Sequence, residues 1–390
     1  MVDGSLEIPL ARPDLGTREE ELLLDVVRSG RLSLGPMLGR FEEAFARWFG
    51  TEDAVAVSSG TAGLHLGVRA LGWGPGDEVV TTPFSFISSA NCLLYEGAAP
   101  VFCDIDPVTL NIDPEAARAA VTERTVGLLP VHIFGYPAAM AELERLAGER
   151  GLGVLEDACE AVGAVDGEGI RVGGRGNLAT FAFYANKQLV TGEGGVIIPS
   201  SPEVASRLRS ERNQGRDPNM GWLEHERLGF NYRLTDMQAA LGVAQLERAD
   251  SLLAERARVA ALYNERLRQD GAAPAGEGDP DGVVLPCADR GSERRSWFVY
   301  VVRLPADSDR EAVIDYLAER GVASKAYLPC IHLMPPYRER FGLSEGRFPV
   351  AEHVAACSLA LPFFTAMRET EIERVAESLA AAVRSRVASH

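Results

Sequence analysis

Residues 181–195 read FAFYANKQLVTGEGG and contain Lys187, one of only two lysines in a chain of 390 residues. The chain has 39 basic residues, so all of them except Lys187 and Lys325 are arginines. An ammonium group can lose its proton when it is desolvated, whereas a guanidinium group cannot. The residues before Lys187 are apolar, and a desolvated amine is the nucleophile of Schiff-base chemistry. Lys187 is therefore a candidate catalytic amine, with an ordinary solvated lysine as the alternative.

The sequence on either side of this stretch indicates the fold class. Between about residues 50 and 200, short apolar runs such as DAVAV (53–57), EVVTT (78–82) and GVLED (153–157) alternate with stretches of helical spacing. This alternation predicts an α/β fold with a mostly parallel central sheet and helices on both faces. Ligands of such sheets bind beyond the carboxyl ends of the strands, so we expect the site there.

The length of the chain predicts two domains. Thr235 is an expected N-cap, and residues 235–267 are typical of one long helix, bent or straight, that joins the domains. We predict a large domain over residues 1–250, including the N-terminal segment, and a small C-terminal domain over residues 251–390.

The small domain is expected to be of the α+β type. WFVYVVRL (297–304) is typical of a strand, and REAVIDYLAERG (310–321) and ETEIERVAESLAAAVRS (369–385) are typical of helices. The stretch GAAPAGEGDPDG (271–282) is rich in glycine and proline and predicts an exposed loop.

Composition and charge exclude several classes of protein. Hydrophobic residues make up 46% of the chain and charged residues 24%, as in globular proteins. A formal net charge of −17 disfavours binding to nucleic acid or to an anionic membrane surface. The N-terminal MVDGSLEIPL lacks the basic and apolar regions of a secretory signal, and no apolar run could span a membrane, so we expect a cytoplasmic protein. Six cysteines without CxxC or CxxH spacing predict neither a metal site nor a disulfide framework.

The stretch after the strand at 53–57 predicts an anion site. It reads SSGTAGLHL (58–66), and Leu64, Val68 and Leu71 follow at helical spacing. Free backbone N–H groups at the start of such a helix would point at one spot and can bind a phosphate. The alternative is a capped helix that binds nothing, because serine, threonine and glycine open many helices.

Asp157 ends the strand predicted at 153–157, on the edge of the sheet where the phosphate loop also opens. A partly buried carboxylate there needs a cationic partner, and the protonated ring nitrogen of pyridoxal 5'-phosphate (PLP) fits that requirement. An aspartate that caps the next helix is the alternative. Phosphate loop, strand-end aspartate and lysine, in this order on one parallel sheet, predict a PLP site of fold type I.

Almost from end to end, the chain resembles the sugar aminotransferases of the DegT/StrS type, which act on nucleotide-linked keto sugars. The motifs that carry the resemblance are SGRLSLGP (29–36), SSGTAGLHL (58–66), GDEVVTTPFSFISSAN (76–91), GAAPVFCDID (97–106), LPVHIFGYPA (129–138), EDACEAVGA (156–164), FYANKQLVTGEGG (183–195) and LGFNYRLTDMQAALGVAQL (228–246).

The resemblance implies a role for each matching residue. Lys187 would form the Schiff base with the cofactor and later carry a proton between the cofactor and the sugar carbon. Asp157 would pair with the pyridinium nitrogen, and Phe86 would stack on the ring face. Phosphate contacts would come from Gly60, Thr61 and Ala62.

The resemblance also implies a homodimer with shared active sites, because Asn231 would reach the cofactor phosphate of the partner subunit. Two positions depart from the commonest pattern of the family. Ala182 stands where many relatives have a serine that binds the phosphate, so another group or a water must replace that hydroxyl. Glu160 stands where many have glutamine near the phenolic oxygen of the cofactor, and a carboxylate there would repel that oxygen unless protonated or turned away.

The stretch CIHLMPPY (330–337) is similar to that of family members that aminate carbon 4 of a 4-keto-6-deoxyhexose, such as the perosamine synthases. His332 and Tyr337 are then candidate substrate contacts, although a histidine in such a stretch can equally be structural. Lys325 and Arg338 are candidate contacts to a nucleotide diphosphate, with solvated surface charge as the alternative.

We therefore expect a PLP-dependent aminotransferase that takes an amino group from glutamate and passes it to a nucleotide-linked keto-deoxysugar, with the cofactor alternating between PLP and its pyridoxamine form. A sugar dehydratase on the same scaffold is one alternative, but its relatives keep histidine where Lys187 stands. A noncatalytic regulator or scaffold is the other. Arg233 and Trp222 are candidate interface or substrate residues, whereas His132 supports no hydrolase triad because GxSxG is absent.

Overall fold

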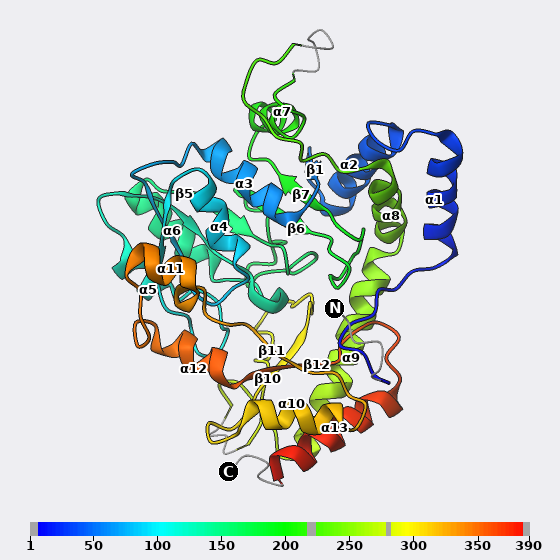
Figure 1. Cartoon of the computed structure of the whole chain (residues 1–390), viewed down its shortest axis with the longest axis vertical. Helices are drawn as coiled ribbons and strands as arrows, with labels where there is room; N and C mark the ends of the chain where they lie inside the picture. Colours follow the sequence, from blue (N-terminus) through cyan, green and yellow to red (C-terminus); the bar gives the residue numbers. More distant parts are fainter. Residues whose placement is uncertain (1–6, 217–223, 278–281, 385–390) are drawn as a thin grey trace.

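The computed structural model of the chain describes residues 7–216, 224–277 and 282–384. The described residues form one seven-stranded and one five-stranded sheet. In Figure 1 the larger sheet and its helices occupy the upper part of the molecule, and the smaller sheet lies below with α10 and α13 beneath it.

The seven-stranded sheet has the strand order β1-β7-β6-β5-β4-β2-β3. Each neighbouring pair from β6 to β3 is parallel, whereas β7 runs antiparallel to both β6 and β1. The prediction of a mostly parallel α/β sheet is confirmed. The strands are β1 (Val55–Val57), β2 (Glu78–Thr81), β3 (Ala99–Phe102), β4 (Thr125–Leu129), β5 (Gly153–Asp157), β6 (Leu178–Ala182) and β7 (Gly195–Ile198).

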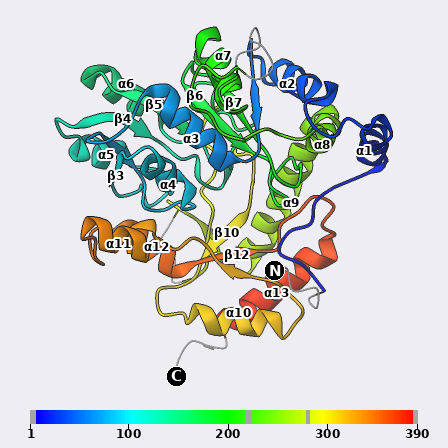
Figure 2. The ribbon, with the colours of Figure 1, turned by 45° about the horizontal axis from the view of Figure 1, so that its top comes forward.

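Helices pack on both faces of this sheet (Figure 2). They are α1 (Thr17–Ser29), α2 (Pro36–Phe49), α3 (Gly60–Leu71), α4 (Ser88–Tyr95), α5 (Pro114–Ala120), the 3₁₀ turn η1 (Ile133–Gly135), α6 (Met140–Arg150), α7 (Pro202–Glu211) and α8 (Asp236–Glu247). Side chains of the strands alternate between the faces: Val196 and Ile198 pack with α2 and α8, whereas Ile197 between them packs with α3. Both faces of the central strands are therefore buried, which explains their nearly continuous apolar sequence.

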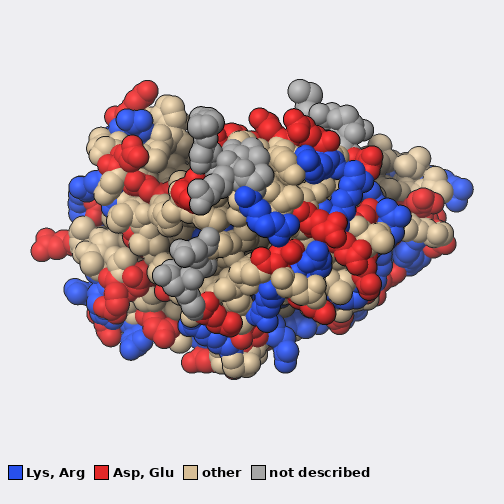
Figure 3. Space-filling model, turned by 90° about the horizontal axis from the view of Figure 1, so that it is seen from below, with Lys and Arg blue, Asp and Glu red and all other residues tan. Residues whose placement is uncertain are grey.

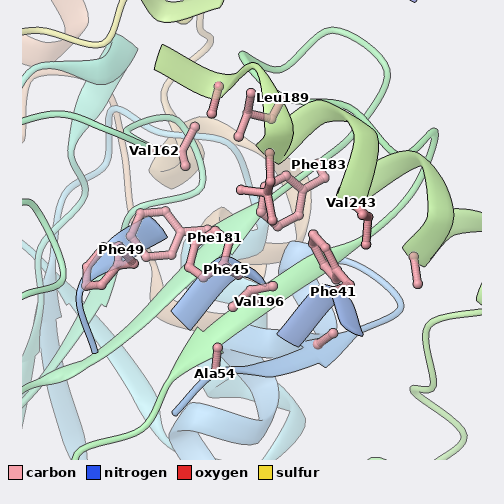
Figure 4. Close-up of a cluster of buried hydrophobic side chains, with 14 of the residues drawn as sticks. Phe41, Phe45, Phe49, Ala54, Val162, Phe181, Phe183, Leu189, Val196 and Val243 are labelled. Atoms are coloured by element: carbon pink, nitrogen blue, oxygen red, sulfur yellow. The ribbon is translucent and has the colours of Figure 1, made fainter. Parts of the chain in front are cut away.

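Phenylalanines dominate the core between α2 and the sheet (Figure 4). Phe41, Phe45 and Phe49 lie four residues apart on α2 and so share one face of that helix. Phe45 and Phe49 contact Phe181 of β6 at ring-centroid distances of 5.7 and 5.6 Å, and Phe41 lies 5.7 Å from Phe183. This packing fixes the position of β6, which leads directly into the loop that carries Lys187.

The predicted long helix is present and bent. Thr235 caps α8 and its hydroxyl accepts a hydrogen bond from the N–H of Gln238. The helix is interrupted at Arg248, whose φ of −129° is not helical, and resumes as α9 (Ala249–Gln269). Helix α9 then runs from the large sheet to the small one, as Figure 2 shows.

The five-stranded sheet has the order β11-β12-β10-β9-β8 and is accompanied by helices, as predicted for an α+β layer. Its strands are β8 (Ala273–Pro274), β9 (Val284–Leu285), β10 (Tyr300–Arg303), β11 (Lys325–Ala326) and β12 (Ser358–Leu361). Its helices are α10 (Arg310–Ala318), the 3₁₀ turn η2 (Ile331–Leu333), α11 (Pro335–Phe341), α12 (Pro349–Cys357) and α13 (Glu369–Arg384).

Two details of this region bear on the sequence predictions. The expectation of an exposed loop over 271–282 is wrong at Ala273–Pro274, because these residues pair with β9, and its residues 278–281 lie outside the described residues. Ile8 forms a bridge with Val322 and packs in the core of the small sheet, so the start of the described chain contacts the C-terminal part. The domain boundary at residue 250 stays a prediction.

The surface carries charges of both signs. On the face seen in Figure 3, acidic and basic side chains are interspersed. Within the three described segments of the chain, no helix has the length and apolarity needed to cross a membrane.

Candidate active site

A cavity of about 390 Å³ opens at the carboxyl ends of β5 and β6 and at the N-terminus of α3. Pockets of about 300–1,000 Å³ are typical of small-molecule sites. The cavity is also bounded by residues that precede β10 and follow β11 in the small sheet. Its lining consists of Ser59, Gly60, Thr61, Leu64, Ser85, Phe86, Ser88, Ser89, Val131, Asp157, Cys159, Glu160, Ala182, Tyr184, Asn186, Lys187, Glu193, Gly194, Phe298, Tyr327 and Leu328.

Lys187 lies in the loop between β6 and β7, and its backbone N–H donates to the carbonyl of Tyr184. The Nζ atom lies 3.6 Å from Oε1 of Glu160 and 3.7 Å from the ring centroid of Phe298. The side chain is only 12% exposed. Lys187 is therefore a desolvated amine in the cavity rather than a solvated surface lysine.

Asp157 ends β5 and is 5% exposed. Its Oδ2 accepts a hydrogen bond of 2.7 Å from the hydroxyl of Ser89, and its Oδ1 accepts one of 3.1 Å from the N–H of Cys159. The hydroxyl of Ser85 lies 2.7 Å from that of Ser89 and extends the chain of hydrogen bonds. No lysine, arginine or histidine among the described residues forms an ion pair with Asp157, so this buried carboxylate is matched to a cationic ligand.

The N-terminus of α3 forms another wall of the cavity. Ser59 caps the helix: its hydroxyl accepts from the N–H of Ala62, and its carbonyl accepts from the N–H of Gly63. The N–H groups of Gly60 and Thr61, in the first turn, have no partner within the helix and can bind an anion. Ala62 does not line the cavity and its N–H is already used by the cap.

Helix α3 approaches β6 so closely that only glycine fits at position 60. A Cβ atom there would lie 2.8 Å from both the Cβ of Ala182 and the Sγ of Cys159. Ala182 lines the cavity where the family often has a serine. Thr61 and Ser88, which line the same cavity as Ala182, supply hydroxyl groups there. Their oxygens, Oγ1 and Oγ, lie 2.8 Å apart.

Glu160 lies beside Lys187, and its other oxygen, Oε2, accepts a hydrogen bond of 2.9 Å from the N–H of Phe134. Burial raises the pKa of the Glu160 carboxyl, although the ammonium of Lys187 acts in the opposite direction. Phe134 holds this N–H in place with a left-handed backbone conformation, at a φ of 54°.

Phe86 and Asn231 lie at more exposed positions. Phe86 borders the cavity and is 60% exposed. Asn231 is exposed on the segment between α7 and α8, and its backbone forms an isolated antiparallel β-bridge with Asn213. It does not line the cavity of its own chain. Arg233 donates to the side chain of Asn213. Trp222 lies outside the described residues.

The substrate residues suggested by the stretch 330–337 are not in the cavity. His332 is fully buried, with its Nε2 3.0 Å from Glu352, and burial lowers its pKa. Tyr337 is fully buried and donates to the side chain of Asn91. Lys325, on the edge strand β11, and Arg338, on α11, are exposed. The structure thus brings Gly60, Thr61, Phe86, Asp157, Glu160 and Lys187 together, and it does not bring His332 or Tyr337 to them.

His132 is a structural residue. Its Nδ1 accepts a hydrogen bond from the N–H of Ala138, so the ring proton is on Nε2, which donates to Glu156 at 3.0 Å. Both side chains are fully buried, and Glu156 belongs to β5.

The residues of the site that the sequence analysis did not assign include Ser89, Phe298 and Tyr327. The hydroxyl-rich stretch at 88–89 could have suggested a partner for Asp157. Phe298 lies in an apolar run before β10 and looks like an ordinary core residue, and Tyr327 carries no local signal.

These residues fit PLP. The cavity contains a desolvated amine for the aldehyde, an unpaired carboxylate for the ring nitrogen, and free N–H groups for the phosphate. When bound, the cofactor supplies the electron sink for reactions of amines.

Comparisons with known proteins agree with this geometry. The chain is 38% identical over 376 residues to the GDP-perosamine synthase of Caulobacter vibrioides, which covers 95% of this chain and 97% of that one. It is 35% identical to the pleiotropic regulatory protein of Geobacillus stearothermophilus, with 97% of each chain covered. The crystal structure of S. venezuelae DesV is similar with a TM-score of 0.85, at 35% identity and 95% coverage of each chain.

The family model of the DegT/DnrJ/EryC1/StrS aminotransferases matches residues 13–380. The chain therefore belongs to this family and is a PLP-dependent sugar aminotransferase.

Proposed function

We propose that the enzyme transfers the amino group of glutamate to the C4 keto group of a nucleotide-linked 4-keto-6-deoxyhexose. The observation that carries the transfer chemistry is the meeting of Lys187, Asp157 and the N-terminus of α3 in one cavity. The sugar and the position of amination rest on the likeness to a GDP-perosamine synthase and on the stretch CIHLMPPY.

The residues of the chain have distinct tasks in this proposal. The carboxylate of Asp157, oriented by Ser89, would hold the protonated ring nitrogen of the cofactor. The N–H groups of Gly60 and Thr61 would hold its phosphate, and Phe86 would provide an apolar contact to its ring. The Nζ atom of Lys187 would be the amine that holds the cofactor aldehyde, and it would serve as the group that carries a proton during the transfer.

We further propose a homodimer in which each subunit lends Asn231 to the site of the other. Asn231 is exposed and lies on a segment anchored beside the α3 loop, because the N–H of Ser58 donates to the carbonyl of Tyr232. Large apolar side chains are exposed in the same part of the molecule: Phe86 and Tyr184 at the cavity and Leu228 on the segment, which is 73% exposed. A second copy of the chain would cover them.

The two alternatives can be distinguished from this proposal. A regulatory role is favoured by the 35% identity to a pleiotropic regulatory protein, but a regulator would not need a desolvated lysine in the same cavity as an aspartate that forms no ion pair within the described residues. A dehydratase of the related type would have histidine at position 187.

The test begins with the protein loaded with PLP. We expect a yellow protein whose visible band disappears when glutamate is added, and whose amino group then appears on a GDP- or dTDP-linked 4-keto-6-deoxyhexose, detected by mass spectrometry, with the position read by NMR. A sugar product that has lost oxygen without gaining nitrogen would indicate the dehydratase. No reaction with glutamate or any other amino acid would indicate a regulator.

A further inference from the structure

Arg256 of α9 is a buried cation without a carboxylate partner. Its exposure is 4%, and no aspartate or glutamate of the described segments forms an ion pair with it. Burial lowers the pKa of Arg256 to about 10, so the side chain is still charged at neutral pH. A buried charge that lacks a counter-ion costs about several kcal/mol unless other groups satisfy it, so its neighbours are informative.

The neighbours of Arg256 are the backbone of two residues before β10. Its Nε donates to the carbonyl of Trp297 at 2.7 Å, and its Nη2 donates to the carbonyl of Phe298 at 2.6 Å. The guanidinium also lies 4.9 Å from the ring centroid of Phe363. Arg256 therefore holds a short piece of main chain rather than another charge.

This piece of main chain contacts the lysine loop on its other side. The ring of Phe298 lies 3.7 Å from Nζ of Lys187, and the hydroxyl of Ser296 accepts a hydrogen bond of 2.9 Å from Gln188. Trp297 between them has a φ of 50°, which is unfavourable for a side chain with a Cβ and persists only where the surroundings enforce it. Arg256 and the lysine loop thus both contact residues 296–298.

We propose that Arg256 is a positioning residue for the catalytic amine: by holding the carbonyls of Trp297 and Phe298, it keeps the Phe298 ring against Nζ of Lys187. The ring face attracts an ammonium group, so it confines Nζ to the cavity and favours the form that has taken up the proton during transfer. The inference rests on the proposed function through the role of Lys187, and it adds a connection between α9 and the site that neither the fold nor the family likeness requires.

The test uses Arg256→Met, Phe298→Leu and the double variant in the full-length enzyme. Phe298→Leu removes the ring but leaves both carbonyls for Arg256. A cation–π contact of about 0.5–2 kcal/mol corresponds to a fall in kcat of roughly 2- to 30-fold. If Arg256 acts through the ring, the double variant falls no further in kcat than Phe298→Leu alone. The melting temperature of the double variant, by contrast, falls by the sum of the two single effects. The hydrogen bonds of Arg256 are to main-chain carbonyls, which Phe298→Leu leaves in place, so each substitution removes a separate stabilising contact.

A second readout does not depend on turnover. The cofactor-free variants are mixed with PLP, and the rate of imine formation is followed by absorbance. We expect Arg256→Met and Phe298→Leu to shift this rate in the same direction and by similar factors, and Arg256→Lys, which retains donors for the carbonyls, to return it part of the way to the wild-type rate.

Arg258→Met is the matched control, because Arg258 lies on the same helix, is 42% exposed and pairs with Glu255. It should leave both rates unchanged. The inference is overturned if Arg256→Met keeps wild-type rates, or if the losses in kcat multiply in the double variant. Those results leave the proposed function intact, whereas an inactive wild-type enzyme would refute the function itself.

Discussion

The Nζ atom of Lys187 lies 3.6 Å from Oε1 of Glu160, in a cavity where the glutamate is 7% exposed. The pair is close, yet burial outweighs the attraction and raises the pKa of Glu160. A carboxyl that ionises reluctantly can donate a hydrogen bond to a neighbouring oxygen as well as accept one. The direction of this shift is the one that would reduce the repulsion between a glutamate at this position and the phenolic oxygen of the cofactor.

Glu160→Gln should change how stability depends on pH. The folded pKa of Glu160 is above its ordinary value of 4.5, so its contribution to stability is complete below that value and is lost as pH rises through the folded pKa. Glutamine has no proton to release and can still accept from the N–H of Phe134. We expect the melting temperature of the cofactor-free variant to fall less than that of the wild type as pH rises above the ordinary glutamate pKa of 4.5. Parallel curves for the two proteins would contradict this reading.

Lys187→Arg should abolish transamination without unfolding the protein. Arginine keeps the positive charge but offers no amine that can form an imine. We expect a loss of roughly a thousandfold or more in single-turnover reaction with glutamate, and no visible imine band on addition of PLP. The melting temperature of the cofactor-free variant should remain close to that of the wild type. Turnover by this variant would show that the assignment of Lys187 is wrong.

Ser89→Ala removes the hydroxyl that donates to Oδ2 of Asp157. A hydrogen bond to a charged group contributes about 1.5–3 kcal/mol, so we expect a loss of that size in the free energy of unfolding of the cofactor-free protein. The loss should be smaller with PLP bound, because the ring nitrogen then satisfies the carboxylate. Ser85→Ala is the control: among the described residues its hydroxyl bonds only to that of Ser89, and its removal should cost about 0.5–1.5 kcal/mol in both states. Equal losses for Ser89→Ala with and without cofactor would argue against the pairing of Asp157 with the ring.

Gly60→Ala and Gly39→Ala compare two helical glycines. At position 60 the new Cβ would meet Ala182 and Cys159 at 2.8 Å, so α3 must move away from β6. We expect a loss of stability of about 1–3 kcal/mol and weaker binding of PLP, measured by titration of the cofactor-free protein. At position 39, in α2, nothing lies within 4 Å, and alanine should stabilise the protein by about 0.5–1 kcal/mol without changing cofactor affinity. Wild-type affinity in Gly60→Ala would contradict the placement of the phosphate at α3.

The alternation of apolar runs predicted the parallel sheet because both faces of strands such as β5 and β6 are buried, which leaves continuous apolar sequence. It could not predict that β7 is antiparallel, since the direction of a short buried strand depends on its neighbours and not on its own residues. The sequence placed Asp157 and Lys187 near one another because the carboxyl ends of β5 and β6 share an edge.

The side-chain contacts of Asp157 and Lys187 could not be predicted from the sequence pattern. Phe298, which contacts Lys187, and Arg256, which contacts Phe298, are distant in sequence from Lys187, and no local pattern encodes these tertiary contacts. His332 shows the converse. The neighbouring residues in the sequence suggested a substrate contact, but the structure places the imidazole in the interior beside Glu352. Only its burial distinguishes a structural histidine from one that contacts substrate.

The scarcity of lysine has a practical consequence. Lys187 is enclosed in the cavity and Lys325 is exposed on an edge strand, so the two side-chain amines of the chain occupy opposite environments. Protein grown with isotope-labelled lysine would give an NMR spectrum with a separate signal from each. One signal would report on every event at the cofactor, and the other would serve as an internal reference within the same molecule.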